Sequence, residues 1–210
     1  MDKLREMIAL IDYGMGNLRS VAKALENQGG KILLTSKTKD IERADKIVLP
    51  GVGAFGKAVR NLRSLGLIEP LKKALQSGKP FLGICLGLQI LFEKSEEGGT
   101  SGLGILPGEV KKFPLLSGMK IPHMGWNTVK FQKENHYSSA LFKDIPDGSY
   151  FYFVHSYFVV PAHKEIIAST TFYGIEFVSS IAWKNIFACQ FHPEKSGEMG
   201  LKLISNFLNI

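Results

Sequence analysis

Short apolar runs alternate with amphipathic helical patterns through the first half of the chain, and this alternation constrains the fold more than any other feature. Continuous apolar runs bounded by Gly, Pro or polar residues predict strands that are buried on both faces. Strands that alternate with helices favour a parallel sheet covered by helices on both sides. The predicted strands are residues 7–12, 31–35, 46–49 and 80–84, and the predicted helices are residues 17–28, 56–65, 69–77 and 86–94.

The second half of the chain changes to closely spaced strand patterns with turn signals between them. Several short strands in succession indicate antiparallel additions to the parallel core. Leucine, isoleucine and phenylalanine at helical spacing predict a final helix at 197–209. Because there is no repeat, low-complexity tract or linker, we expect one domain over residues 1–210. The predicted strands are 110–113, 126–132, 149–160, 165–173, 179–183 and 186–191.

Composition and charge argue against several classes of protein. The 210 residues include 26 Lys and Arg against 19 Asp and Glu, but the basic residues are scattered, so we expect no nucleic-acid partner. An anionic substrate or partner near one face stays open. No segment approaches the roughly 18 consecutive apolar residues of a membrane span, and the charged start does not fit a signal peptide. We therefore expect a cytoplasmic protein that does not bind a membrane.

The segment 80–92 contains the first candidate for chemistry. An apolar strand runs into Cys85, which has Gly83 and Gly87 two residues to either side, and a helix follows at once. This is the pattern of a nucleophile elbow, in which glycines leave room for a sharp turn from strand to helix. The turn places the sulfur at a helix N-terminus, where unpaired N–H groups favour the reactive thiolate. We therefore predict that Cys85 is a nucleophile.

A cysteine nucleophile needs a base, and the base needs a group that orients it. His192 ends the apolar strand 186–191 and is followed by Pro193 and Glu194. Proline ends the strand and fixes the turn, which brings Glu194 close to the imidazole. Because open α/β sheets carry their sites at the carboxyl ends of strands, we predict that Cys85, His192 and Glu194 meet there.

A glycine-containing segment, 49–53, follows the third strand and offers a place for a developing oxyanion. Glycines let the backbone approach a substrate and present N–H groups. Together with the N–H of Leu86, which directly follows the nucleophile, Val52 and Gly53 are the predicted oxyanion hole.

These motifs together resemble the class I, triad-type, glutamine amidotransferases. The resemblance rests first on Gly-Ile-Cys-Leu-Gly-Leu-Gln at 83–89 and Gln-Phe-His-Pro-Glu at 190–194, and Leu88 separates the chain from relatives that serve anthranilate or guanylate synthesis. The family's fold is flavodoxin-like: a central, mostly parallel sheet with helices on both faces and added antiparallel strands. Further matching segments lie at 11–21, 49–53, 122–127, 152–157 and 191–196.

The resemblance implies a role for each site residue. Cys85 attacks the amide of glutamine to form a γ-glutamyl thioester, His192 moves the protons, and Glu194 orients His192. Tyr152 falls at a position that lines a subunit interface. The positions that hold glutamine are Gly51, Gly53, Gln89, Ser156 and Tyr157.

The resemblance also implies a partner and leaves alternatives. The motif variants point to a heterodimer with a (β/α)₈-barrel cyclase of histidine biosynthesis, which receives the ammonia directly. A second hypothesis keeps the glutaminase chemistry and gives the ammonia to a sugar amidotransferase of surface-polysaccharide synthesis. A third is a non-catalytic module on the same fold, and the intact Cys85, His192 and Glu194 argue against it.

The remaining cysteine and histidines have structural explanations. Cys189 lies three residues before His192 and on the opposite face of its strand, so we expect it to be buried. His123 and His155 are expected to be core or interface histidines, and His136 and His163 to lie on the surface.

We expect neither a metal nor a cofactor. The histidines and cysteines do not have the spacing of a zinc site. The segment 51–56 spells Gly-x-Gly-x-x-Gly, but it does not follow the first strand of the sheet. The next strand also ends without the acidic residue that a dinucleotide fold requires.

Overall fold

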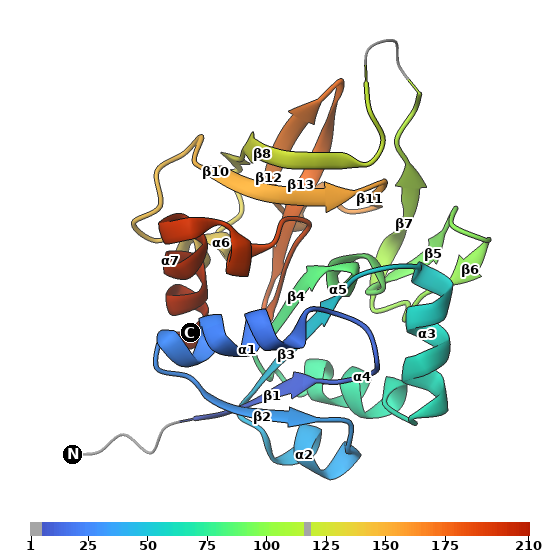
Figure 1. Cartoon of the computed structure of the whole chain (residues 1–210), viewed down its shortest axis with the longest axis vertical. Helices are drawn as coiled ribbons and strands as arrows, with labels where there is room; N and C mark the ends of the chain where they lie inside the picture. The colour runs from blue at the N-terminus through green and yellow to red at the C-terminus, as the bar shows by residue number, and fades with distance from the viewer. Residues whose placement is uncertain (1–5, 116–118) are drawn as a thin grey trace.

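Five parallel strands form the centre of the fold, in the order β2-β1-β3-β4-β14. The computed structural model describes residues 6–115 and 119–210 (Figure 1). The order is that of a flavodoxin-like sheet, in which β14 occupies the place of the fifth strand. The predicted fold class is therefore confirmed. The strands are β1 (Met7–Ile11), β2 (Lys31–Thr35), β3 (Lys46–Gly51), β4 (Phe81–Cys85) and β14 (Ile186–Cys189).

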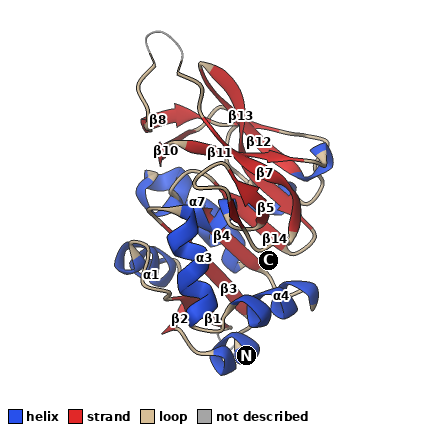
Figure 2. Ribbon diagram, turned by 90° about the vertical axis from the view of Figure 1, so that its right-hand side faces the viewer, coloured by secondary structure: helices blue, strands red, loops and turns tan. Residues whose placement is uncertain are grey.

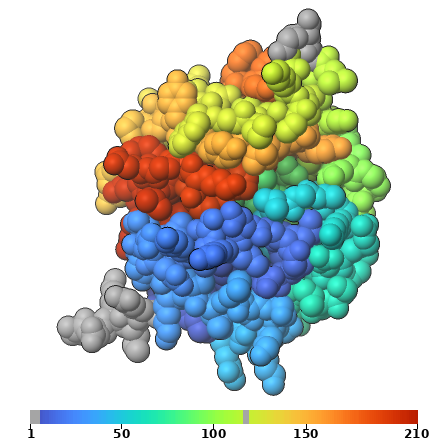
Figure 3. All heavy atoms as spheres, viewed as in Figure 1, coloured from blue at the N-terminus to red at the C-terminus, as the bar shows by residue number. Residues whose placement is uncertain are grey.

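Helices cover both faces of this parallel sheet, as the continuous apolar strands predict. Successive residues of a strand point to opposite faces, so Ala9 and Ile11 join one apolar cluster while Ile8 and Leu10 join the other. The first cluster packs under α2 (Thr38–Arg43), α3 (Phe55–Ser64) and α4 (Ile68–Gln76), and the second under α1 (Leu18–Asn27), α6 (Ser138–Leu141) and α7 (Gly197–Leu208). On the face shown in Figure 3, α1 (blue) and α7 (red) lie side by side.

Strands that pair mostly antiparallel, with β5 and β7 parallel to each other, extend the sheet beyond β14 and make up the upper end of the molecule in Figure 2. The path continues β13-β11-β7-β5-β6, with β12 on β13 and β9 on β12. These strands are β5 (Phe92–Ser95), β6 (Thr100–Ser101), β7 (Leu106–Lys112), β9 (Lys130–Phe131), β11 (Tyr157–Pro161), β12 (Ile167–Tyr173) and β13 (Ile175–Trp183).

A separate two-stranded antiparallel sheet, called here the β8–β10 ribbon, crosses above α7. It consists of β8 (His123–Thr128) and β10 (Tyr150–His155), and β10 contacts α7 and the short helix η2 (Pro193–Lys195) (Figure 1). The predicted strand 149–160 is therefore wrong as one element. It divides at Ser156 into β10 and β11, which belong to different sheets.

The predicted helix 86–94 is also wrong in its length. Only Leu86–Gln89 is helical (α5), and the chain then enters β5. The run from Leu86 to Phe92 is fully buried, so no solvent-facing side breaks its apolar pattern. Such a run does not distinguish a buried helix from a strand. The helix α5 ends early because the following residues pair with β7, and that contact is not local in the sequence.

Other elements follow local signals closely. Asn17 caps α1 by accepting a hydrogen bond from the Ser20 backbone N–H at 3.3 Å, and the helix gives way to Gly29, which has a φ of +90°. In the described parts of the chain, no helix has both the length and the apolar character to cross a membrane. The organisation of residues 1–210 as one domain stays a prediction.

Candidate active site

Cys85 lies at a strained turn between β4 and α5. It is a non-glycine residue with φ at +55°, a conformation that costs about 1–3 kcal/mol and persists at functional sites. A Cβ on Gly83 would lie 2.8 Å from the Gly87 carbonyl oxygen, and one on Gly87 would overlap the Leu49 carbonyl oxygen. Both glycines are therefore required by the close approach of backbone, as in a nucleophile elbow. Because α5 has only one turn, its dipole contributes less than that of the predicted longer helix.

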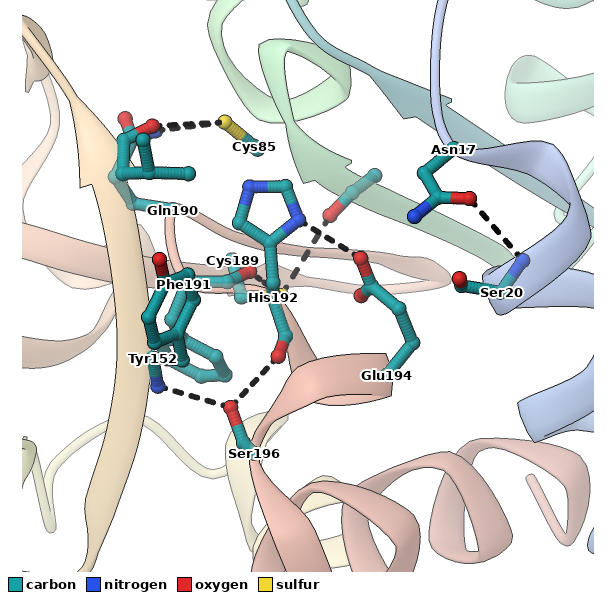
Figure 4. Close-up of polar contacts among 12 residues, drawn as sticks. Asn17, Ser20, Cys85, Tyr152, Cys189, Gln190, Phe191, His192, Glu194 and Ser196 are labelled. Atoms are coloured by element: carbon teal, nitrogen blue, oxygen red, sulfur yellow. Dashed lines mark hydrogen bonds and ion pairs between the residues drawn. The ribbon is translucent and has the colours of Figure 1, made fainter. Parts of the chain in front are cut away.

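His192 and Glu194 follow β14, the strand that pairs in parallel with β4. Parallel neighbours end at the same edge of a sheet, so the residues after β14 lie beside Cys85. His192 Nδ1 is 2.8 Å from Glu194 Oε1, and the two side chains are 3% and 1% exposed. Figure 4 shows the imidazole between the Cys85 sulfur and the Glu194 carboxylate.

The backbone of His192 is held by the β8–β10 ribbon. Its N–H donates to the Tyr152 carbonyl oxygen at 2.9 Å. The Ser196 hydroxyl donates to the His192 carbonyl oxygen at 2.6 Å and accepts from the Tyr152 N–H at 3.0 Å (Figure 4). Tyr152 therefore positions the histidine through its backbone, while its own ring lies 6.2 Å from that of Trp126, centre to centre.

The electrostatic setting of His192 favours the protonated ring. Burial lowers the pKa of the imidazole, but the neighbouring Cys85 and the Glu194 carboxylate outweigh burial and raise the pKa to about 10. Nε2 is buried without a hydrogen-bond partner. The ring thus has one nitrogen on a carboxylate and the other free to exchange a proton with the sulfur. This is the arrangement that a general base beside a thiol requires.

A pocket of about 240 Å³ opens at the Cys85 sulfur. Pockets for drug-sized ligands are larger, at about 300–1,000 Å³, so this one suits a small molecule. The predicted residues that line it are Val52, Gly53, Cys85, Leu86, Gln89, Ser156 and Tyr157. Gly51 does not line the pocket: it ends β3, and a Cβ there would overlap the Tyr13 hydroxyl. The absence of a side chain there is required sterically, and direct contact of Gly51 with substrate stays a prediction.

Two polar residues of the site were missed in the sequence. Glu97 lines the pocket, and its Oε2 accepts from the Phe55 N–H at the start of α3, at 2.8 Å. Gln190 donates from Nε2 to the Cys85 sulfur at 3.5 Å. Nothing in the local pattern around Glu97 signals a binding role, because its place depends on how β5 folds back toward α3. Gln190 could have been found from its position two residues before His192.

His123 and His155 are buried, as expected for core histidines, and lie against each other. Their nearest ring nitrogens, His123 Nδ1 and His155 Nε2, are 3.0 Å apart. Burial lowers the pKa of His123 to about 4 and that of His155 to about 3, so both rings are neutral. His155 also lines the pocket.

The other predicted placements are confirmed. His136 and His163 are exposed. Cys189 is buried, with its sulfur 3.4 Å from the Phe191 carbonyl oxygen, and burial raises the pKa of its thiol.

Over residues 6–115 and 119–210, no group of three or more His, Cys, Asp or Glu side chains is arranged to hold a metal ion.

The match to a protein family agrees with this geometry. Residues 9–210 match the family described as glutamine amidotransferase class-I. The chain belongs to the class I glutamine amidotransferase family.

Its curated relatives identify a narrower group to which it is similar. The imidazole glycerol phosphate synthase subunit HisH of Moorella thermoacetica is 52% identical over 201 residues, which cover 95% of this chain and 93% of the relative. The subunit of the same name from Aquifex aeolicus is 53% identical over 200 residues, or 94% of each chain. That of Gloeothece citriformis is 53% identical over 204 residues, or 97% and 95%.

Solved structures agree on the fold. A structure of PurLQS from Thermotoga maritima has a TM-score of 0.74 at 21% identity and covers 98% of this chain and 99% of that one. A glutamine amidotransferase of Thermotoga maritima has a TM-score of 0.63 at 16% identity and covers 90% and 76%. At these identities the likeness concerns the fold alone.

Proposed function

We propose that this chain is the glutaminase subunit of imidazole glycerol phosphate synthase. It hydrolyses glutamine to glutamate and ammonia and passes the ammonia to a (β/α)₈-barrel cyclase, which makes imidazole glycerol phosphate and an aminoimidazole carboxamide ribotide in histidine biosynthesis. The observation that carries the proposal is the buried His192–Glu194 pair beside Cys85, which itself lines a small pocket. The relatives at about 50% identity support the acceptor.

The pocket supplies groups that complement glutamine at both ends. The Glu97 carboxylate gives a negative charge for the α-ammonium group. Ser156 and Tyr157, at the junction of β10 and β11, face the same space and can bind the α-carboxylate end. This leaves the side-chain amide of glutamine directed at Cys85, and Gln89 lies along the path.

The chemistry proceeds through a thioester. The Cys85 proton moves to His192 Nε2, and the sulfur attacks the amide carbon, which places negative charge on the amide oxygen. Backbone N–H groups of Val52, Gly53 and Leu86 stabilise that oxygen, and one such donor is worth about 3–4 kcal/mol. When the intermediate collapses, His192 gives its proton to the departing ammonia. His192 then takes a proton from water, which attacks the thioester and releases glutamate.

Ammonia needs a path that excludes water, because in water it is mostly protonated and not nucleophilic. The β8–β10 ribbon offers a surface for a partner that could supply such a path. Met124 and Trp126 of β8 and Tyr150 of β10 are large, apolar and exposed, and Tyr152 lies beside Trp126. Exposed apolar patches of this kind mark protein–protein interfaces. We place the cyclase on this ribbon, where its contact also reaches the backbone that holds His192.

The alternative acceptor, a sugar amidotransferase, has less support. All eight relatives compared at 50–53% identity are named as subunits of imidazole glycerol phosphate synthase. Nothing in the pocket bears on the acceptor, since the acceptor binds the partner. The expected cytoplasmic location stays a prediction.

The test is glutamate release by the purified chain, with and without the cyclase subunit and its nucleotide ligand. We expect slow release from the chain alone and a large increase in the complex. Cys85→Ala should abolish release in both cases, whereas the control Cys189→Ala should retain it. Glutamine-dependent synthesis that survives Cys85→Ala would refute the mechanism, and release that does not respond to the cyclase would refute the partner.

A further inference from the structure

Gln190 is a fully buried amide in direct contact with the nucleophilic sulfur. Its side chain is 0% exposed, and Nε2 donates to Cys85 Sγ at 3.5 Å (Figure 4). Its other end, Oε1, accepts from Gln89 Nε2 at 3.0 Å. The mechanism above assigns nothing to this residue. A buried polar group that meets a reacting atom needs an explanation.

The orientation of the Gln190 amide follows from the Tyr157 backbone carbonyl, which can accept a hydrogen bond but cannot donate one. Gln89 Nε2 donates to the Tyr157 carbonyl oxygen at 3.0 Å, and a carbonyl oxygen only accepts. Gln89 must therefore direct its NH₂ group inward, and the second N–H of that group meets Gln190. Gln190 must then offer Oε1 to Gln89, which leaves its own NH₂ group on the sulfur.

A second chain of hydrogen bonds reaches the same carbonyl from the β8–β10 ribbon. Asn127 Nδ2 donates to the Phe172 carbonyl oxygen at 2.9 Å and lies 3.2 Å from His123 Nε2. His123 Nε2 is then the acceptor, and its Nδ1–H donates to His155 Nε2 at 3.0 Å. His155 Nδ1–H donates to the Tyr157 carbonyl oxygen at 2.8 Å. Every donor in this chain points toward Tyr157, which requires both rings to be neutral.

The two chains meet at one carbonyl oxygen and leave it no freedom to turn. The Tyr157 carbonyl accepts from His155 on one side and from Gln89 on the other. A change in the ribbon is thereby linked by hydrogen bonds to the amide on the sulfur. His155 and Gln89 both donate to this carbonyl, so no proton can pass through it from one chain to the other. The two chains therefore hold side chains in position and do not conduct protons.

We propose that Gln190 is a further catalytic residue, whose side-chain N–H holds and stabilises the Cys85 thiolate before attack. The inference rests on the proposed glutaminase function. The proton of the sulfur moves to His192 Nε2, because the setting of that ring favours its protonated form. The negative charge stays on the sulfur, where the Gln190 N–H faces it as a donor in addition to the protonated His192. Once the thioester forms, the sulfur is neutral and the contact weakens.

If Gln190 served only in packing, the reactivity of the Cys85 sulfur would not depend on the Gln190 amide. Apart from His192 and Gln190, a polar neighbour of Sγ is the Val154 carbonyl oxygen, at 4.0 Å, which can accept from a thiol but repels a thiolate. Of the Gln190 amide and the Val154 carbonyl, only the amide favours the charged form. The two explanations therefore differ in how Cys85 reactivity depends on pH.

The test is the rate of Cys85 alkylation by iodoacetamide as a function of pH, which needs neither glutamine nor the cyclase. Gln190→Met removes the donor at similar volume, and Gln190→Glu keeps an acceptor for Gln89 but turns an oxygen to the sulfur. Hydrogen bonds to charged groups are worth enough to move the midpoint of the profile up by about one to two pH units, and the neutral-pH rate down about 10- to 100-fold. The control Gln132→Met should leave the profile unchanged, because Gln132 bonds to Thr170, outside the site.

An unchanged profile in either folded Gln190 variant would overturn the inference. If both variants fail to fold, the unaltered chain gives the answer: the side-chain amide proton signals of Gln190 should move as Cys85 titrates, and a constant position would overturn it. Loss of glutaminase activity in Gln190→Glu should appear in kcat, with KM for glutamine within about threefold, since Gln190 does not line the pocket. A chain without glutaminase activity but with a shifted alkylation profile would refute the proposed function and leave Gln190 in its role.

Discussion

Replacing Glu194 by glutamine tests the buried pair at the centre of the site. The substitution keeps an oxygen that can accept from His192 Nδ1, now at 2.8 Å, and removes only the charge. Both side chains are almost fully buried, so solvent screens the pair little. The expected effect is therefore on the proton that His192 carries, and through it on stability.

The magnitude follows from the two protonation equilibria of His192. Its pKa is about 10 in the folded chain against an ordinary 6.5, so the folded state keeps the proton over about 3.5 more pH units. The corresponding stabilisation is at most about 5 kcal/mol. It is fully present below about pH 6.5 and is lost as the pH rises through about 10. Because Cys85 also raises this pKa, we expect Glu194→Gln to forfeit about half, or about 2–3 kcal/mol.

The assay is urea denaturation of both proteins at about pH 6 and about pH 10.5, followed by circular dichroism. The difference in unfolding free energy should be about 2–3 kcal/mol at the lower pH and should vanish or reverse at the higher pH, where His192 is mostly neutral. Titrating groups away from Cys85, His192 and residue 194 are common to both proteins and cancel. The control is Glu165→Gln, which removes an exposed carboxylate 3.5 Å from His163 and should change stability by less than about 0.5 kcal/mol. A difference that does not depend on pH would refute the account of the pair.

Two further predictions concern the elbow and the partner surface. Gly87→Ala should cost about 3 kcal/mol and prevent alkylation of Cys85, because the new Cβ overlaps the Leu49 carbonyl. The control is Gly29→Ala, where a Cβ meets open space; it should cost about 1 kcal/mol because of the positive φ and should leave alkylation of Cys85 intact. Both variants are compared by thermal denaturation, and an equal loss of stability in the two would count against the steric argument. Trp126→Ala should weaken cyclase binding at least about 10-fold in titration calorimetry without changing the melting temperature. Leu34→Ala, equally exposed on β2, should not weaken binding, and an unaffected Trp126 variant would move the interface elsewhere.

The parallel half of the fold was predictable because its signals are local. The strand Lys31–Thr35 matches its prediction residue for residue, and α1 lies within one residue of the predicted helix at each end. Continuous apolar runs, an Asn cap and a following glycine each act within a few residues. Where the pattern does not distinguish helix from strand, as in the buried run 86–92, the prediction failed. The segment 149–160 likewise contains no Gly or Pro turn signal at Ser156, although the two strands there join different sheets.

The candidate site was predictable where its residues lie in motifs at strand ends. Cys85 ends β4, and His192 and Glu194 follow β14, the parallel neighbour of β4, so a single rule about strand ends brings them together. No such rule predicts that Glu97 and Gln190 belong to the site. Glu97 reaches the pocket because β5 turns back, and Gln190 matters because of which amide and which carbonyl face it.

The central claim is that Cys85 is the nucleophile, activated by the imidazole of His192. Labelling with a glutamine-analogue diazo ketone, followed by peptide mass spectrometry, tests it most directly. We expect a single adduct, on the peptide that contains Cys85, and its loss in a folded His192→Ala variant. An adduct on Cys189, or undiminished labelling of Cys85 without His192, would contradict it.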